Sequence, residues 1–270
     1  MLDEATRAKL AKRLHEAEKS RKAIRLFSAQ FPDMTISDAY AIQRAWVDIK
    51  LSEGRRVIGN KIGLTSRAMQ SLGNINEPDY GVLLDDMLYH DGAEIPVNRF
   101  ITPMLENELA FILGKPLEGP NCTIFDVFSA TEYVIPALEI VDLRMMRNDP
   151  ETNGQRKIFD TIADNAANAA LVIGGRPIRP LDVDLRWVGA LCYRNNVLEE
   201  SGIAAAVLNH PANGIAWLAN KLAPHSQRLE AGQLVMAGSF TRTVPARAGD
   251  TFHVDYGALG SISCRFVGET

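Results

Sequence analysis

MLENELAFIL, residues 104–113, reads as a β-strand, because apolar residues run without a break from Leu109 to Leu113 and the signals that begin or end a helix are missing. Side chains alternate across a strand, so Glu106 and Glu108 point to the same face, about 7 Å apart along it. Burying two unpaired carboxylates beside an apolar segment is unfavourable. This pair therefore needs water, a basic partner or a divalent cation.

A third carboxylate interrupts another apolar run. VIPALEIVD, residues 134–142, contains Glu139 in a strand that is expected to be buried on both faces. Three glutamates on neighbouring strands would form an all-oxygen site suited to Mg²⁺ or Mn²⁺, with positions left for water and substrate oxygens. The spacing alone leaves a second interpretation open, in which Glu106 and Glu108 lie on the wet face of an edge strand and Glu139 pairs with an arginine.

The composition is that of an ordinary globular protein. The chain has 270 residues, of which 46% are hydrophobic and 23% charged, and its net charge is −4. This length allows one large domain or two smaller ones. No basic patch with interleaved aromatic residues stands out, so we expect no nucleic-acid partner.

The lack of a visible targeting signal and the pattern of cysteines lead us to expect a cytoplasmic protein. We find no apolar segment of secretory type at the N-terminus and no apolar run of transmembrane length, so no membrane association is expected. The three cysteines, Cys122, Cys192 and Cys264, are far apart and odd in number. They indicate a reducing compartment rather than a disulfide framework or a cysteine-based zinc site.

The N-terminal part is predicted to be helical. Residues 3–25 have the pattern of a polar helix, and a second helix is predicted from about Ser37 to Glu53. Thr35 and Asp38 have the spacing of a capping box in front of that second helix.

The remainder of the chain is dominated by patterns of short strands. One predicted hairpin turns at Asp91-Gly92, between strands at 83–89 and 93–97. We therefore divide the chain into a helical region, residues 1–75, and a β-rich region, residues 76–270. The boundary is soft, and one domain remains an alternative.

A lysine stands out in VIGNKIGLTS, residues 57–66. Lys61 lies between apolar residues and two glycines. If it is buried, its pKa falls, and a neutral amine can act as a base near pH 7; a nearby cation would push the pKa the same way. Taken alone, the residues favour a lysine that reaches solvent from a strand end.

Three further groups are candidates with two interpretations each. Asp79, in a turn-rich loop, could line a site or shape the turn. Asp164 and Asn165, in a segment of small residues, could make hydrogen bonds around a metal or simply cap and pack a helix. Ser239 and Thr241 end a predicted strand, where their hydroxyls could hold a carboxylate or satisfy a turn.

Taken together, these segments resemble the hydratase/decarboxylase branch of the fumarylacetoacetate hydrolase superfamily, in the same order and over nearly the whole chain. The matching segments are KIGLTS (61–66), EPDYG (77–81), ENE (106–108), PALE (136–139), DNAAN (164–168), NHPANG (209–214), GSFT (238–241) and GDTFHVDYG (249–257).

The resemblance implies an α+β architecture, a mixed β-rich fold of the fumarylacetoacetase C-terminal type with an N-terminal helical cap. It implies Mg²⁺ or Mn²⁺ on Glu106, Glu108 and Glu139. It also implies a cytoplasmic homo-oligomer, expected to be a decamer, with a small-molecule substrate.

The activity that the resemblance implies is hydration. The family acts on 2-hydroxy-2,4-dienoates and their 2-oxo tautomers, and we expect 2-hydroxyhepta-2,4-diene-1,7-dioate to be converted to 4-hydroxy-2-oxoheptanedioate in aromatic meta-cleavage degradation, in the homoprotocatechuate pathway. Lys61 is expected to move protons, with Asp79 as a helper. Asp164 and Asn165 would order water or ligands.

Hydroxyl groups and a cation of the protein are expected to bind the substrate. Ser239 and Thr241 are expected to bind substrate. The distal carboxylate of a diacid needs a cation, for which a guanidinium is geometrically suited. The candidates, which the sequence does not rank, are Arg67, Arg156, Lys157 and Arg242.

Other functions remain open. A decarboxylase for 4-oxalocrotonate-type substrates and a hydratase for 2-hydroxypenta-2,4-dienoate would share the same metal and lysine. A metal-free glycosidase is disfavoured, because the spacing of Glu106 and Glu108 does not place them across a sugar. A non-catalytic binding protein of the same fold is least favoured, since Lys61 and all three glutamates are present.

Overall fold

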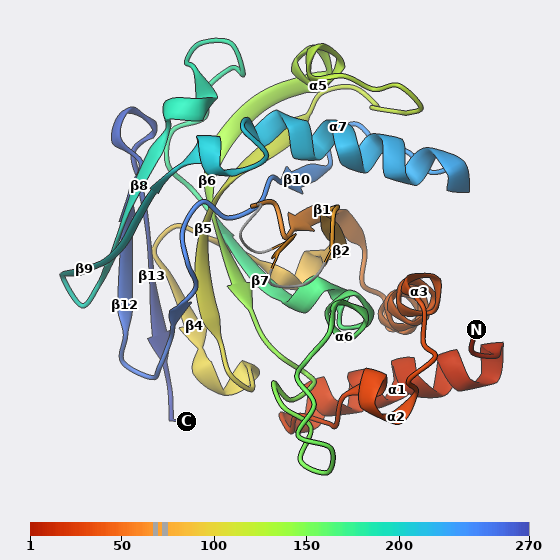
Figure 1. Ribbon diagram of the computed structural model, residues 1–270. Helices are drawn as coiled ribbons and strands as arrows, with labels where there is room; N and C mark the ends of the chain where they lie inside the picture. The colour runs from red at the N-terminus through yellow and green to blue at the C-terminus, as the bar shows by residue number, and fades with distance from the viewer. Residues whose placement is uncertain (67–69, 72–74, 270) are drawn as a thin grey trace.

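The computed structural model describes residues 1–66, 70–71 and 75–269, and it is built around two β-sheets (Figure 1). The larger sheet is mixed and has the strand order β2-β1-β10-β5-β6-β7-β3, with β11 pairing on β5. Its strands are β1 (Val57–Gly63), β2 (Asp79–Leu84), β3 (Leu88–His90), β5 (Met104–Leu113), β6 (Thr131–Val141), β7 (Asn168–Ile173), β10 (Leu234–Met236) and β11 (Val244–Pro245).

The smaller sheet has five strands in the order β4-β13-β12-β8-β9. Buried and exposed residues alternate along β12 and β13, as expected for a sheet with one face on a core and one in solvent. Its buried residues join the core shared with the larger sheet. The strands are β4 (Ala93–Pro96), β8 (Gly189–Arg194), β9 (Val197–Ile203), β12 (Thr251–Asp255) and β13 (Ser261–Val267).

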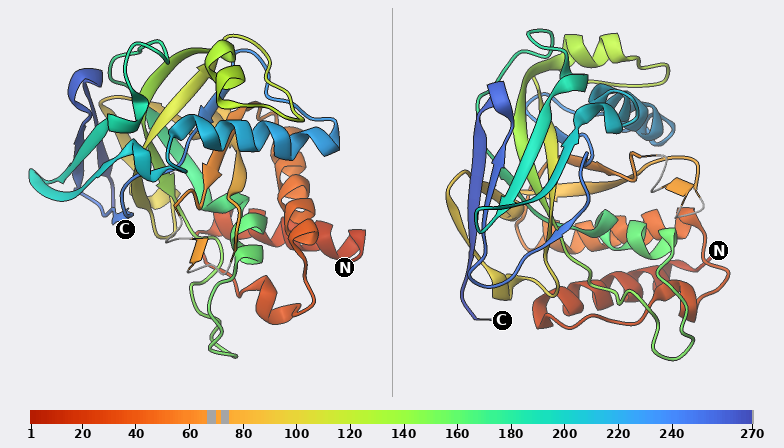
Figure 2. Two further views of the ribbon diagram at one scale, coloured as in Figure 1. Left: turned by 45° about the horizontal axis from the view of Figure 1, so that its top comes forward. Right: turned by 60° about the vertical axis from the view of Figure 1, so that its left-hand side comes forward.

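Helices cover both faces of the larger sheet (Figures 1 and 2). Strand residues that alternate toward one face form a core with α1 and α3, and those toward the other face form a core with α7 and the smaller sheet. In both figures the N-terminal helices and α7 lie on opposite sides of the sheet. The helices are α1 (Glu4–Ser20), α2 (Phe27–Gln30), α3 (Ile36–Ser52), α5 (Ile124–Ala130), α6 (Ile158–Ala163) and α7 (Pro211–Leu222).

Several local predictions are confirmed. The second helix begins at the predicted capping box, in which the Thr35 side chain accepts from the Asp38 backbone N–H and the Asp38 carboxylate accepts from the Thr35 backbone N–H. The 104–113 strand has the predicted length. The smaller sheet contains two hairpins, β8–β9 and β12–β13. None of the helices among the described residues is long and apolar enough to cross a membrane.

The hairpin predicted at Asp91-Gly92 is wrong. β3 pairs with β7 in the larger sheet, whereas β4 pairs with β13 in the smaller one, so the turn joins two sheets. The Asp91 N–H donates to Ile173 and the Gly92 N–H to Ser263, which lie in these two different sheets. A turn signal predicts a local reversal but not the pairing partners.

The strand predicted to end at Ser239 and Thr241 is also shorter than expected. Only Leu234–Met236 pairs in the sheet. Gly238 has a φ of 112°, a conformation that ends the extended run. The division of the chain near residue 75 stays a prediction; β1, which precedes it, and β2, which follows it, pair with each other along their length.

Candidate metal and acid–base site

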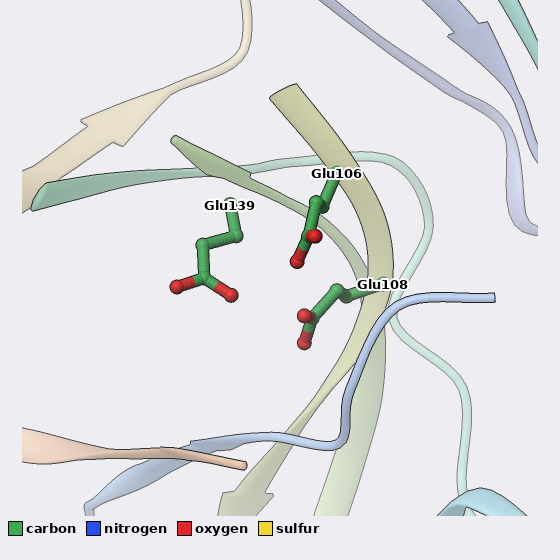
Figure 3. Close-up of side chains that lie close together, drawn as sticks. All are labelled: Glu106, Glu108 and Glu139. Atoms are coloured by element: carbon green, nitrogen blue, oxygen red, sulfur yellow. The ribbon is translucent and has the colours of Figure 1, made fainter. Parts of the chain in front are cut away.

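Three carboxylates converge on one face of the larger sheet (Figure 3). β5 and β6 are antiparallel, and their register places Glu106 directly opposite Glu139, with Glu108 two residues further along the same face. One oxygen of each carboxylate lies within 4.8 Å of an oxygen of the other two. β5 lies between β10 and β6, so the edge-strand interpretation of Glu106 and Glu108 is wrong.

Several oxygens of this cluster lack protein partners. Glu108 and Glu139 are completely buried, yet Glu108 Oε1 and Glu139 Oε2 accept no hydrogen bond from the described residues. The same holds for both carboxylate oxygens of buried Asp79. Buried acceptors without partners are costly and rare. Glu106, Glu108 and Glu139 therefore fit a hard divalent cation, which prefers such oxygen ligands.

The protonation of the cluster supports this fit. Burial, followed by the charge of Glu139, raises the pKa of Glu106 to about 7. Burial, followed by the charges of Glu139 and Glu106, raises the pKa of Glu108 well above its ordinary value. Glu106 and Glu108 thus resist ionising beside Glu139, and a bound cation would reverse this preference.

Lys61 lies beside the carboxylates. It is buried on β1, its Nζ is 3.1 Å from Glu139 Oε1, and it donates a hydrogen bond of 2.9 Å to the carbonyl of Ala166. Burial lowers the pKa of Lys61, but the charges of Glu139, Asp79 and the other two glutamates together raise it by more, so the pKa lies above its ordinary value. The expected net fall of this pKa is therefore wrong, because the neighbouring carboxylates outweigh the effect of burial.

Asp79 is part of the same cluster. It lies at the first residue of β2 and not in the turn before it. β1 pairs there with β2, and a Cβ on Gly63 would collide with Asp79 Oδ1 and lie 3.2 Å from Lys61 Nζ. Burial raises the pKa of Asp79, and the charge of Lys61 opposes that rise. The structure thus brings together both residues predicted for proton transfer.

A left-handed turn closes the site on the side of α6. Asn165, Ala166 and Ala167 have φ angles of 52°, 51° and 61°, in the left-handed region, which asparagine tolerates and alanine does not. Each of the two alanines there costs about 1–2 kcal/mol. The turn directs the Ala166 carbonyl to Lys61 and is followed by Asn168, whose Nδ2 donates to Glu139 Oε1 at 3.0 Å.

The turn is docked against β2 by its first residue. The Asn165 side chain accepts from Val82 N at 2.8 Å and donates to Val82 O at 2.9 Å, as a neighbouring strand would. Gly81 permits this approach, because a Cβ there would lie 2.5 Å from the Asn165 carbonyl oxygen. The backbone of this segment therefore lies close to β2 at Gly81.

The Asp164 carboxylate contacts two arginines. It accepts hydrogen bonds from Arg144 Nε and, at 2.8 Å, from Arg156 Nη2. These contacts anchor the start of the left-handed turn. A direct role of Asp164 or Asn165 in binding substrate or water stays a prediction.

The segment after β10 reaches the site through its backbone. The Gly238 N–H donates to Glu108 Oε2 at 2.9 Å. The Thr241 hydroxyl instead accepts from Asn107, whose side chain alternates to the other face of β5, and the Ser239 hydroxyl donates to the Thr241 carbonyl. Substrate binding by Ser239 and Thr241 stays a prediction.

The cations proposed for a distal carboxylate have other contacts. Arg156 donates to Met145 O and Thr161 as well as to Asp164. Arg242 is 87% exposed and pairs with Glu200. Lys157 is exposed, and Arg67 lies outside the described residues.

Three contacts of the site were not assigned from the sequence. Two are backbone groups, the Ala166 carbonyl and the Gly238 N–H, which no residue type signals. The third is the Asn168 amide. Asn168 ends the DNAAN motif, in which roles are expected from the sequence only for Asp164 and Asn165.

Known proteins are similar to this chain over nearly its whole length. No family model matches the chain. It is 64% identical over 267 residues to a 2-oxo-hept-4-ene-1,7-dioate hydratase of Escherichia coli, covering 99% of this chain and 100% of that protein. It is 40% identical over 257 residues to a 2-hydroxyhexa-2,4-dienoate hydratase of Comamonas testosteroni, covering 94% and 95%.

Two solved structures are also similar. A 4-oxalocrotonate decarboxylase from Pseudomonas putida G7, complexed with magnesium and adipate, matches with a TM-score of 0.94 at 35% identity, covering 99% of both chains. A fumarylpyruvate hydrolase from Pseudomonas aeruginosa, with Mn²⁺ and pyruvate, matches with a TM-score of 0.59 at 14% identity, covering 78% of this chain and 89% of that one, and shows the fold alone.

Proposed function

Because the chain belongs to the hydratase/decarboxylase branch of the fumarylacetoacetate hydrolase superfamily, we propose that it is a divalent-metal-dependent hydratase. Its substrate is 2-oxo-hept-4-ene-1,7-dioate, as the 2-hydroxyhepta-2,4-diene-1,7-dioate tautomer, and its product is 4-hydroxy-2-oxoheptanedioate. The reaction belongs to aromatic meta-cleavage degradation, in the homoprotocatechuate pathway. The observation that carries this proposal is 64% identity over 99% of the chain.

Glu106, Glu108 and Glu139 are the ligands of Mg²⁺ or Mn²⁺ in this proposal. Their buried oxygens without protein partners support it. When bound, the cation supplies Lewis-acid stabilisation of negative charge on the C2 oxygen of the substrate. Asn168 and Gly238 hold two of the three carboxylates in place, through hydrogen bonds to Glu139 and Glu108.

Lys61 is the proposed acid and base. Its ammonium has three N–H bonds; one is directed to Glu139 and one to Ala166, and we assign the third to the substrate. Lys61 Nζ gives a proton to C5 of the dienol while the C2 hydroxyl gives up its own proton, which returns to the lysine, and the product is the 2-oxo-3-ene. Water then adds its oxygen at C4, and one of its protons is transferred to C3. Asp79, which is buried beside Lys61, assists these transfers.

A decarboxylase is the second candidate. The Pseudomonas putida G7 decarboxylase, which is complexed with magnesium and adipate, matches with a TM-score of 0.94 at 35% identity. Product analysis separates them. Incubation with the seven-carbon dienoate and Mg²⁺ should yield a product heavier by one water, and release of CO₂ would instead support the decarboxylase.

We also propose a cytoplasmic homo-oligomer, a decamer. The smaller sheet and the chain before it expose Trp187, Val197 and Leu198, at 70%, 62% and 50%, which is typical of a surface that associates. A groove of about 730 Å³ between the smaller sheet and residues 183–188 supports a partner surface here. All three cysteines are free and buried, which suits a reducing compartment. Light scattering should give ten times the mass of one chain, and a monomer mass would contradict it.

A further inference from the structure

The loop between β6 and α6 carries Arg144, a buried cation that contacts none of the proposed metal ligands. Its side chain is 2% exposed. Its guanidinium carbon lies 5.3 Å from the centre of the Trp46 ring, on α3. A charge buried this completely needs several compensating partners.

These partners are at the two ends of one turn. Before the turn, Arg144 Nε donates to Asp164 Oδ1 and Nη2 donates to the Asp164 carbonyl at 2.7 Å. After it, Nη2 donates to the Asn168 carbonyl at 2.9 Å. A planar guanidinium can serve both ends at once, which a lysine ammonium on a flexible stem cannot do equally well.

The enclosed residues are those in the unfavourable left-handed conformation, Asn165, Ala166 and Ala167. Strained backbone persists only where surrounding contacts impose it. The same turn presents its Ala166 carbonyl to Lys61 and leads directly to Asn168, which holds Glu139. If the turn relaxes, both groups lose their support.

We propose that Arg144 is a positioning residue, which holds the left-handed turn 165–167 closed and thereby fixes Lys61 and Glu139. The Trp46 ring packs on the guanidinium, so helix α3 helps to hold Arg144 in place. The inference rests on the proposed function in assigning working roles to Lys61 and Glu139. It requires that losing the guanidinium weaken metal binding and turnover while substrate affinity is largely retained.

The test compares Arg144→Lys with a matched control. In Arg144→Lys, kcat should fall about 10- to 100-fold and Kd for Mn²⁺ should rise about 10-fold by calorimetry, with KM within about 2-fold. The control is Arg7→Lys. Arg7 makes the same kind of contact with buried Asp38, at 3.0 and 2.7 Å, but joins α1 to α3 away from the carboxylates. Its kcat and Kd should stay within about 2-fold of wild type.

A rescue separates positioning from general stability. Glycine adopts positive φ without steric cost. Adding Ala166→Gly and Ala167→Gly to Arg144→Lys should therefore restore kcat and Mn²⁺ affinity about 10-fold, even without the guanidinium. If Arg144→Lys does not fold, Asp164→Asn weakens the same contacts and should show the same split between kcat and KM.

Two outcomes overturn the proposal. One is an Arg144→Lys protein whose kcat and Mn²⁺ affinity match those of Arg7→Lys. The other is a loss of activity that the glycine pair does not restore. Because metal affinity is measured without substrate, a wild type that leaves the seven-carbon dienoate unchanged would refute the proposed function alone.

Discussion

Replacing Glu108 by glutamine should stabilise the metal-free protein at neutral pH. Glu108 is completely buried, its Oε1 has no partner among the described residues, and burial followed by Glu139 and Glu106 raises its pKa. An amide has the same shape, and its oxygen can still accept from the Gly238 N–H. The substitution removes the ionisable group and keeps the hydrogen bond.

The magnitude follows from proton linkage. A raised carboxyl pKa means that the folded state keeps a proton that the unfolded state, near the ordinary value of 4.5, has released. Stability of the wild type therefore falls as pH rises above 4.5, by about 1.4 kcal/mol per unit, until the pH passes the folded pKa. Coulomb repulsion between two carboxylates within 4.8 Å, at an effective dielectric constant of about 20, sets the size of this loss at about 3 kcal/mol.

Thermal unfolding in EDTA measures the effect. At about pH 7.5 the Glu108→Gln protein should unfold roughly 6–12 °C above wild type, and at about pH 4 the difference should nearly vanish, because the carboxyl is then largely protonated in both states. Saturating Mg²⁺ should reverse the order, since a ligand at about a thousand times its Kd stabilises the wild type by about 4 kcal/mol. A variant that is less stable than wild type at both pH values would show that the carboxylate is structural.

Three further substitutions test neighbouring parts of the site. Lys61→Ala should keep metal binding and lose at least about 100-fold in kcat, and near-normal turnover would remove Lys61 from the chemistry. Glu106→Gln should weaken Mg²⁺ binding in a calorimetric titration, and an unchanged titration would refute its role as a ligand. Gly81→Ala should lower stability by about 1–3 kcal/mol and reduce kcat, because its Cβ would lie 2.5 Å from the Asn165 carbonyl oxygen; unchanged melting and turnover would show that the turn can move aside.

The carboxylate cluster was largely predictable from the sequence. Alternation along a strand places Glu106 and Glu108 on one face, and the apolar run around Glu139 indicates a buried neighbour. The register that sets Glu139 opposite Glu106 depends on strand pairing between segments 33 residues apart (139 − 106 = 33), so spacing alone left the ligand set open. The family resemblance supplied what the local pattern lacked.

Other features depend on contacts that no local pattern encodes. The Asp91-Gly92 turn signal was real, but backbone pairing with two different sheets decided where its strands went. The Ala166 carbonyl reaches Lys61 only because alanine is held in a left-handed conformation, against its own preference. Arg144, which imposes that conformation in our proposal, acts on residues 20 to 24 positions away.

Metal-dependent hydration is the central claim, and a UV assay of metal-stripped protein tests it most directly. The protein is incubated with 2-hydroxyhepta-2,4-diene-1,7-dioate before and after Mg²⁺ is added, and the product is identified by mass. We expect no loss of diene absorbance before Mg²⁺, and rapid loss afterwards with a product heavier by one water. Equal turnover without the cation, or loss of CO₂ in place of a gain of water, would contradict the proposal.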